Sequence, residues 1–93
     1  MNKTRVIWPK PVQNKIFSYH SKHFTIEETR RFLANWILEA EKNLLNPIIS
    51  KTYTEEYGEY KGVSRIIVNK FKVYYECYGD DIVIVAVKFP GKN

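Results

Sequence analysis

The second half of this sequence carries basic and aromatic side chains on segments that could bring them together. Arg65 and Lys72 lie on two strand-like segments joined by a short turn, so a hairpin would place them on adjacent strands. The lysines that accompany them are Lys51, Lys70, Lys88 and Lys92, and the nearby tyrosines are Tyr53, Tyr57, Tyr60 and Tyr74. Cations beside exposed aromatic rings are suited to gripping single-stranded nucleic acid.

The same groups could also cleave RNA. With Glu55 or Glu56 as general base, a 2′-hydroxyl could attack the neighbouring phosphate, and the cations would stabilise the developing negative charge. The residues alone leave a second interpretation open, in which the face is a solvated sheet edge and the tyrosines belong to the core.

Other chemistry has less support in the sequence. His20 and His23 are three residues apart, but the chain offers no further histidine and one cysteine, so we expect surface or helix-end histidines and no metal site. Cys77 falls on the apolar side of an expected strand, which predicts a small buried side chain and not a nucleophile. Phosphate-binding loops, hydrolase elbows and zinc-protease motifs are missing from the sequence, and we expect no cofactor.

Composition predicts one basic domain spanning residues 1–93. Hydrophobic residues make up 44% of the chain, enough for a core, and the formal net charge is +5. Residues 1–24 carry five basic side chains and no acidic one, so the charge is polarised and favours a polyanionic partner. No segment approaches the ~20 apolar residues of a membrane span, and a single cysteine suits a reducing cytosol; we therefore expect a cytoplasmic protein with no membrane partner.

The expected elements begin with a strand, two helices and a loop. A β-rich run at 4–8 is stopped by prolines, and an apolar stripe predicts a helix over 10–22. Thr25 and Glu28 form a capping box that starts a second helix, which ends at Asn46-Pro47. The segment 46–62 reads as a loop with one short strand around 48–53.

Three strands are expected after the loop, at 63–68, 71–78 and 82–87, with turns at 69–70 and 79–81. The last strand lacks polar alternation, as if covered on both faces. The fold class is therefore α+β, with the order β-α-α-β-β-β and a twisted, mostly antiparallel sheet that carries an N-terminal antiparallel helical hairpin on one face. The residues expected in the core are Trp8, Leu33, Trp36, Ile37, Val73 and Ile84.

The linear pattern resembles the toxins of the RelE/ParE superfamily over nearly the whole chain. The resemblance rests on the opening strand through Val6-Ile7-Trp8-Pro9, the hairpin ending in Leu44-Leu45-Asn46-Pro47, and the last strand from Asp80 to Val87. Its most specific part is the run from Tyr60 to Tyr75, in which Gly62, Arg65 and a basic-apolar-apolar-Tyr step recur as in that family. The resemblance implies the α+β fold described above and a toxin–antitoxin pair, in which an acidic segment of a cognate antitoxin wraps and neutralises the toxin.

The family's branches differ in target, and the resemblance implies a site only for one of them. ParE-like members poison DNA gyrase by binding, whereas RelE-like members cleave mRNA in the ribosome. In the nuclease branch, Glu55 matches the position of a glutamate by its spacing from Pro47, but Lys72 replaces an arginine, and residues 88–93 hold no histidine or tyrosine. An ammonium lacks the planar fork of a guanidinium, so Lys72 is not a conservative replacement.

On this basis the sequence favours a ParE-like growth inhibitor acting on gyrase. The first alternative is a RelE-like ribosome-dependent endoribonuclease with Glu55, Arg65 and Lys72 as catalytic candidates, and the second is a nontoxic interaction module on the same fold. The residues expected to contact the target are Lys51, Arg65, Lys70, Lys72, Lys88 and Lys92. The expected partners are the antitoxin and gyrase or the ribosome with its mRNA, and a homodimer is left open.

Overall fold

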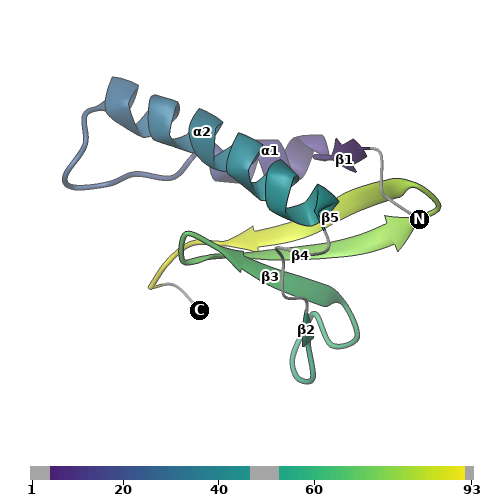
Figure 1. The fold of residues 1–93 in the computed structure, drawn as a ribbon. Helices are drawn as coiled ribbons and strands as arrows, with labels where there is room; N and C mark the ends of the chain where they lie inside the picture. The colour runs from purple at the N-terminus through teal and green to yellow at the C-terminus, as the bar shows by residue number, and fades with distance from the viewer. Residues whose placement is uncertain (1–4, 47–52, 92–93) are drawn as a thin grey trace.

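The computed structural model describes residues 5–46 and 53–91, which form two helices and one sheet (Figure 1). The elements in chain order are β1 Arg5–Ile7, α1 Lys10–Ile16, α2 Ile26–Leu45, β2 Tyr53–Thr54, β3 Ser64–Val68, β4 Phe71–Tyr78 and β5 Asp81–Lys88. The expected order of elements is confirmed, with one addition. The two-residue strand β2 makes the sheet five-stranded, and residues 48–52 of the short strand expected around 48–53 lie outside the described residues.

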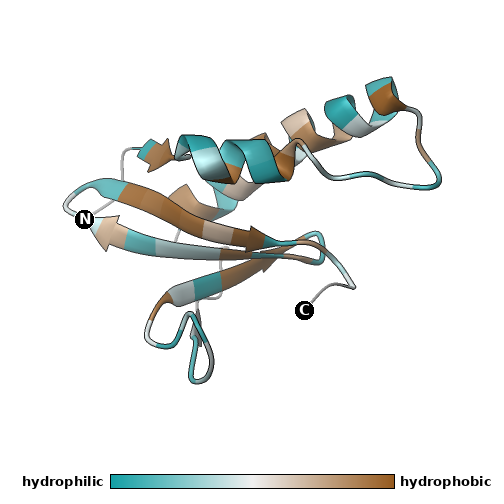
Figure 2. Ribbon diagram, turned by 180° about the vertical axis from the view of Figure 1, so that it is seen from behind, coloured by the Kyte–Doolittle hydropathy of each residue, from teal (hydrophilic) through white to brown (hydrophobic). Residues whose placement is uncertain are grey.

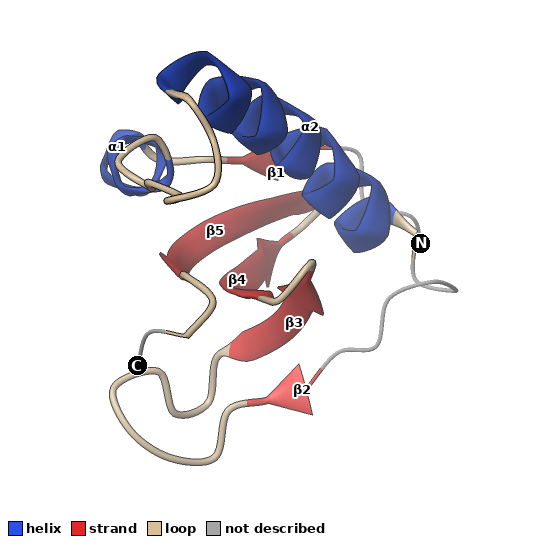
Figure 3. Cartoon of the chain, turned by 90° about the vertical axis from the view of Figure 1, so that its left-hand side faces the viewer, coloured by secondary structure: helices blue, strands red, loops and turns tan. Residues whose placement is uncertain are grey.

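The sheet is mixed, with the spatial order β1-β5-β4-β3-β2. Strand β1 pairs in parallel with β5, and every other neighbouring pair is antiparallel. Figures 1 and 3 show both helices on one face of this sheet, and the two helices run in opposite directions along it. The opposite face, which we call the open face, carries no helix of the described chain. The molecule is therefore an α+β domain with two layers.

Helix α2 begins as the sequence predicts. The Thr25 hydroxyl accepts a hydrogen bond from the Glu28 backbone N–H, and the Glu28 carboxylate accepts one from the Thr25 N–H, which completes the capping box. Its buried side chains recur at helical spacing, at Thr29, Leu33, Trp36, Ala40 and Leu44. In Figure 2 the helix accordingly alternates between hydrophobic and hydrophilic segments along its length.

Helix α1 is shorter than the 10–22 expected from the apolar stripe. It ends at Ile16, and the backbone N–H of Tyr19 then bonds the Ile16 carbonyl in a tight turn. The Tyr19 ring packs against Phe71 and Phe89, with centroids 5.2 and 5.0 Å apart. Packing against these two rings therefore accompanies the turn that ends the helix. His23, expected at the surface or at a helix end, is exposed.

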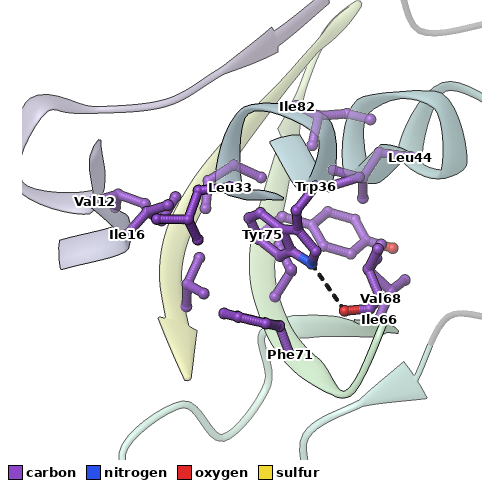
Figure 4. Close-up of a cluster of buried hydrophobic side chains, with 14 residues drawn as sticks. Val12, Ile16, Leu33, Trp36, Leu44, Ile66, Val68, Phe71, Tyr75 and Ile82 are labelled. Atoms are coloured by element: carbon purple, nitrogen blue, oxygen red, sulfur yellow. Dashed lines mark hydrogen bonds between the residues drawn. The ribbon is translucent and has the colours of Figure 1, made fainter. Parts of the chain in front are cut away.

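The core lies between the helices and the sheet (Figure 4). Of the residues expected there, Leu33, Trp36, Val73 and Ile84 are almost fully buried, and Trp8 and Ile37 are partly buried against the cluster. The Trp36 indole stacks obliquely on Phe71 at 4.9 Å and meets the edge of Trp8 at 5.9 Å. Large aromatic side chains thus supply much of the buried surface that holds α2 to the sheet.

A β-bulge in β5 changes which side chains face the helices. Tyr74 pairs with Ala86, but the next residue, Tyr75, pairs with Ile84, so Val85 is the extra residue. Because side chains alternate along a strand, the bulge lets Ile82, Ile84 and Val87 all join the core. The apolar run predicted to be covered on both faces is therefore buried mainly on the helix side.

The expectation for Cys77 is wrong, because its side chain is exposed. Cys77 alternates in step with Val73 and Tyr75 along β4, so it should point to the helix side, where those two residues are buried. Residues 76–78 at the end of the strand, however, are all exposed. Parity along the strand predicts the face, whereas burial depends on how far the helices extend over it.

Candidate functional site

Strand alternation places several basic side chains on the open face. In β4, Phe71, Val73 and Tyr75 face the core, so Lys72 and Tyr74 point to the other side. The register carries this face onto the neighbouring strands, where Arg65 pairs with Tyr74 and Lys88 pairs with Lys72. Arg65, Lys72 and Lys88 are all partly buried, so their charges are less screened by water than those of fully exposed side chains.

Glu55 lies in contact with two of these open-face residues. Its Oε2 atom accepts a hydrogen bond from the Tyr74 hydroxyl at 2.9 Å and one from Arg65 Nη1 at 3.3 Å, which is also an ion pair. The Arg65 and Glu55 side chains are 23% and 20% exposed, so the pair is sheltered but not dry. Three elements meet at this carboxylate: the loop after β2, strand β3 and strand β4.

Tyr74 is buried to 2% exposure although it lies on the open face. Burial raises the pKa of its phenol above the ordinary value of 10.0, and the hydrogen bond to Glu55 raises it further, while Arg65 acts in the opposite direction. Tyr74 therefore donates its proton to Glu55 throughout the neutral range and does not act as a base.

The cover over Tyr74 is a second tyrosine. The Tyr60 ring stacks on Tyr74 with centroids 4.6 Å apart and an interplanar angle of 25°. The Lys88 ammonium lies over both rings, 5.5 Å from the Tyr60 centroid and 5.6 Å from the Tyr74 centroid. The arrangement is a paired aromatic platform with a cation at its face.

The loop 55–63 places Tyr60 there by folding back on itself. Glu55 and the 62–63 segment exchange backbone hydrogen bonds, with Glu55 N–H donating to the Val63 carbonyl and Gly62 N–H donating to the Glu55 carbonyl. Gly62 has φ +88°, a conformation that glycine adopts without steric cost. Figure 3 shows the loop on the side of the sheet away from the helices.

The structure brings together four of the residues selected from sequence, namely Glu55, Arg65, Lys72 and Lys88. Lys70 lies apart from them in the β3–β4 turn, with its side chain exposed, and Lys51 and Lys92 lie outside the described residues. Among the tyrosines, Tyr60 and Tyr74 join the site, whereas Tyr57 is 81% exposed, and the side chain of Tyr53 lies outside the description. Glu56, the other candidate base, is exposed.

Sequence reasoning did not foresee that Tyr74 would bind the candidate base. The available signal was parity, because Tyr74 is two residues from Lys72 and shares its face. The contact itself depends on where the loop 55–63 folds, which no local pattern predicts. The alternative that these tyrosines are core residues holds only in part: Tyr74 is buried but lies outside the helix-side core, Tyr60 is half-buried and Tyr57 is exposed.

The cluster can bind anions and stack on bases. Lys72 and Lys88 could bind phosphate beside the paired Arg65, and the partly exposed Tyr60 ring offers an aromatic surface at the edge of the cluster. Both hydrogen bonds to Glu55 end on its Oε2 atom, so the contacts with Arg65 and Tyr74 fix the orientation of the carboxylate. Within residues 5–46 and 53–91, no three potential metal ligands from His, Cys, Asp and Glu gather.

Comparisons with known proteins give no relative for this chain. No protein-family model, no curated protein and no solved structure matches it. In the described part of the chain, neither helix combines the length and the apolar character that crossing a bilayer requires.

Proposed function

We propose that this chain is the toxin of a bacterial toxin–antitoxin pair, that it is built on the RelE/ParE plan, and that it acts on RNA. The support for the plan is the sequence resemblance together with the observed order of elements, two N-terminal helices on one face of a mostly antiparallel sheet. The support for RNA as target is the open face described above.

One observation carries the choice of target: the Glu55–Arg65–Tyr74 cluster beside Lys72 and Lys88. A carboxylate, a guanidinium and two ammonium groups on one sheltered face are the groups that RNA cleavage through a 2′-hydroxyl needs. The partly exposed Tyr60 ring, stacked on Tyr74, adds a surface on which a base can stack. A toxin that acts by binding gyrase alone needs no such cluster, so the geometry favours the RelE-like alternative over the ParE-like one that the sequence favours.

A gyrase-directed, ParE-like action is the second candidate, and one observation favours it. Glu55 is engaged by both Arg65 and Tyr74, so its carboxylate already has partners within the protein that a structural role would explain. In that case the cluster would serve to hold the loop 55–63 on the sheet. The cationic face would then contact an acidic protein surface.

The antitoxin is proposed as the partner that keeps the toxin inactive. Net charge of +5 and a cationic open face favour an acidic, partly disordered segment as the neutralising element. Such a segment would compete with RNA for the same cations.

The test is inducible expression in bacteria with three parallel readouts: growth, primer-extension mapping of transcripts, and plasmid supercoiling. We expect growth arrest with cuts inside translated codons, and loss of both in Arg65→Gln. Lys22→Gln is the matched control, because Lys22 is exposed in the connection between the helices and carries the same charge. Circular dichroism of each variant checks that the fold is retained.

Two other outcomes contradict the RNA proposal. Arrest with intact transcripts and altered supercoiling would establish the gyrase-directed reading. Normal growth at high expression of folded protein would favour a nontoxic interaction module on this fold.

A further inference from the structure

Lys72 and Lys88 are direct cross-strand partners in the β4–β5 ladder. Both point to the open face, because their neighbours Val73 and Val87 pair on the core side. Side chains directly opposite one another in an antiparallel pair have their Cβ atoms about 5 Å apart, and like charges at such positions destabilise the sheet. The register therefore sets two like charges directly opposite each other, at a cost in sheet stability.

Nothing acidic in the described residues relieves this repulsion. The carboxylate of this cluster, Glu55, lies with Arg65 and Tyr74. The ion pairs of the described chain are Arg65–Glu55 and Arg5–Asp81, and neither includes Lys72 or Lys88. The Lys88 ammonium lies over the rings of Tyr60 and Tyr74, which attract it but carry no net charge.

A third cation lies within reach of the pair. Arg65 is opposite Tyr74, two residues along β4 from Lys72, so it is the diagonal neighbour of Lys72 on the same face. Because Glu55 already pairs with Arg65, the uncompensated charge is centred on the two lysines. A bound anion is the physical element that would turn this arrangement from a cost into a stabilising one.

We propose that Lys72 and Lys88 form a binding site for one phosphate group of single-stranded RNA, next to Tyr60, whose partly exposed ring receives an adjoining base and stacks on Tyr74. The inference rests on the proposed action on RNA and specifies the part of the substrate that the open face recognises. The lysines bind the phosphate as two point charges, which sets the position of the strand without reading its sequence. The two lysines repel each other in the free protein, and binding of the phosphate relieves this repulsion.

The first test measures stability in Lys72→Gln, with Lys22→Gln as control. Lys72 is substituted because Lys88 also makes cation–π contacts with two rings. Losing those contacts in a Lys88 variant would offset the stability gained by removing the repulsion. In low-salt chloride buffer we expect Lys72→Gln to raise the Tm by about 1–5 °C and Lys22→Gln to leave it nearly unchanged. Added sulfate, at matched ionic strength, should stabilise the wild type more than Lys72→Gln. An unchanged or lower Tm in Lys72→Gln, with an equal response to sulfate, would overturn the proposal.

The second test measures binding of a short unstructured oligouridylate as a function of salt. Each phosphate contact that is removed should lower the slope of log affinity against log salt concentration by about 0.7. We expect this change in both Lys72→Gln and Lys88→Gln, with an affinity loss of about 5- to 10-fold at low salt. Lys22→Gln should keep the wild-type slope. Wild-type slopes in both lysine variants would refute the phosphate site.

Growth assays separate this inference from the proposed function. If the wild type arrests growth by cutting transcripts and both lysine variants do so equally well, the phosphate site is refuted while the toxin function stands. If the wild type is harmless but the lysine variants change the salt slope as expected, the toxin function is refuted while the phosphate site stands.

Discussion

The indole Nε1 of Trp36 donates a hydrogen bond to the backbone carbonyl of Val68 at 2.9 Å, with both residues almost fully buried (Figure 4). The bond joins the middle of α2 to the last residue of β3, immediately before the turn into β4. It therefore ties the helical layer to the hairpin that carries Arg65 and Lys72 on its other face.

Replacing Trp36 by phenylalanine should lower the free energy of unfolding by about 2–4 kcal/mol. The variant loses the hydrogen bond, so the buried Val68 carbonyl no longer has the indole N–H as donor. The smaller ring also leaves a cavity beside Phe71. Urea denaturation followed by circular dichroism measures the change. Leu38→Ala is the control, because Leu38 is 64% exposed on the same helix. This substitution should change the free energy of unfolding by less than about 0.5 kcal/mol. Equal losses in the two variants would contradict the role given to Trp36.

Tyr74→Phe should be less stable than the wild type at neutral pH, and the difference between the two proteins should become smaller at alkaline pH. The Tyr74 pKa is raised above 10.0 by burial and by its bond to Glu55, so the phenol contributes stability that is complete below pH 10.0 and falls as the pH rises through the folded-state pKa. We expect a deficit of about 1–2 kcal/mol at pH 7 that shrinks above pH 10.0. Urea denaturation of both proteins across this range checks it, and a deficit that is constant with pH would argue against the hydrogen bond.

Glu55→Gln should tighten RNA binding while abolishing cleavage. The substitution removes the negative charge that now pairs with Arg65, so the guanidinium is freed for phosphate, but it also removes the candidate base. Fluorescence anisotropy with an oligouridylate should show an affinity gain of about 3- to 10-fold at low salt. Glu59→Gln, an equal change of charge at an exposed position of the same loop, should give a smaller gain and keep cleavage. If cleavage persists in Glu55→Gln, Glu55 is not the base.

Lys70→Gly should stabilise the protein by about 0.5–1 kcal/mol. Asn69 and Lys70 have φ values of 50° and 72°, as in the two-residue turns that suit β-hairpins, and such turns favour Asn-Gly because glycine adopts positive φ without strain. Thermal denaturation gives the change in Tm. Because Lys70 lies apart from the cluster, RNA affinity should fall by no more than it does in Lys22→Gln. A larger fall would mean that Lys70 contacts the target, as the sequence predicts.

Local patterns in the sequence determine much of this architecture. Thr25 and Glu28 predict the start of α2 because a capping box is satisfied within four residues of chain. The 69–70 turn and the alternation around Val73 predict the hairpin and the face of Lys72 for the same reason, since hairpin pairing follows from the turn. The hairpin also predicts that Arg65 and Lys72 lie on adjacent strands, as the β3–β4 pairing confirms.

Only the tertiary structure decides what those residues contact. The parallel pairing of β1 with β5 joins the two ends of the chain, and the bulge at Val85 shifts the register beyond Tyr74; neither has a local signal. Cys77 has core parity yet is exposed, and Glu55 meets Tyr74 only because the loop 55–63 folds back over the sheet. Turns, caps and parity act over a few neighbouring residues, whereas burial and side-chain partners depend on packing between segments that are distant in the chain.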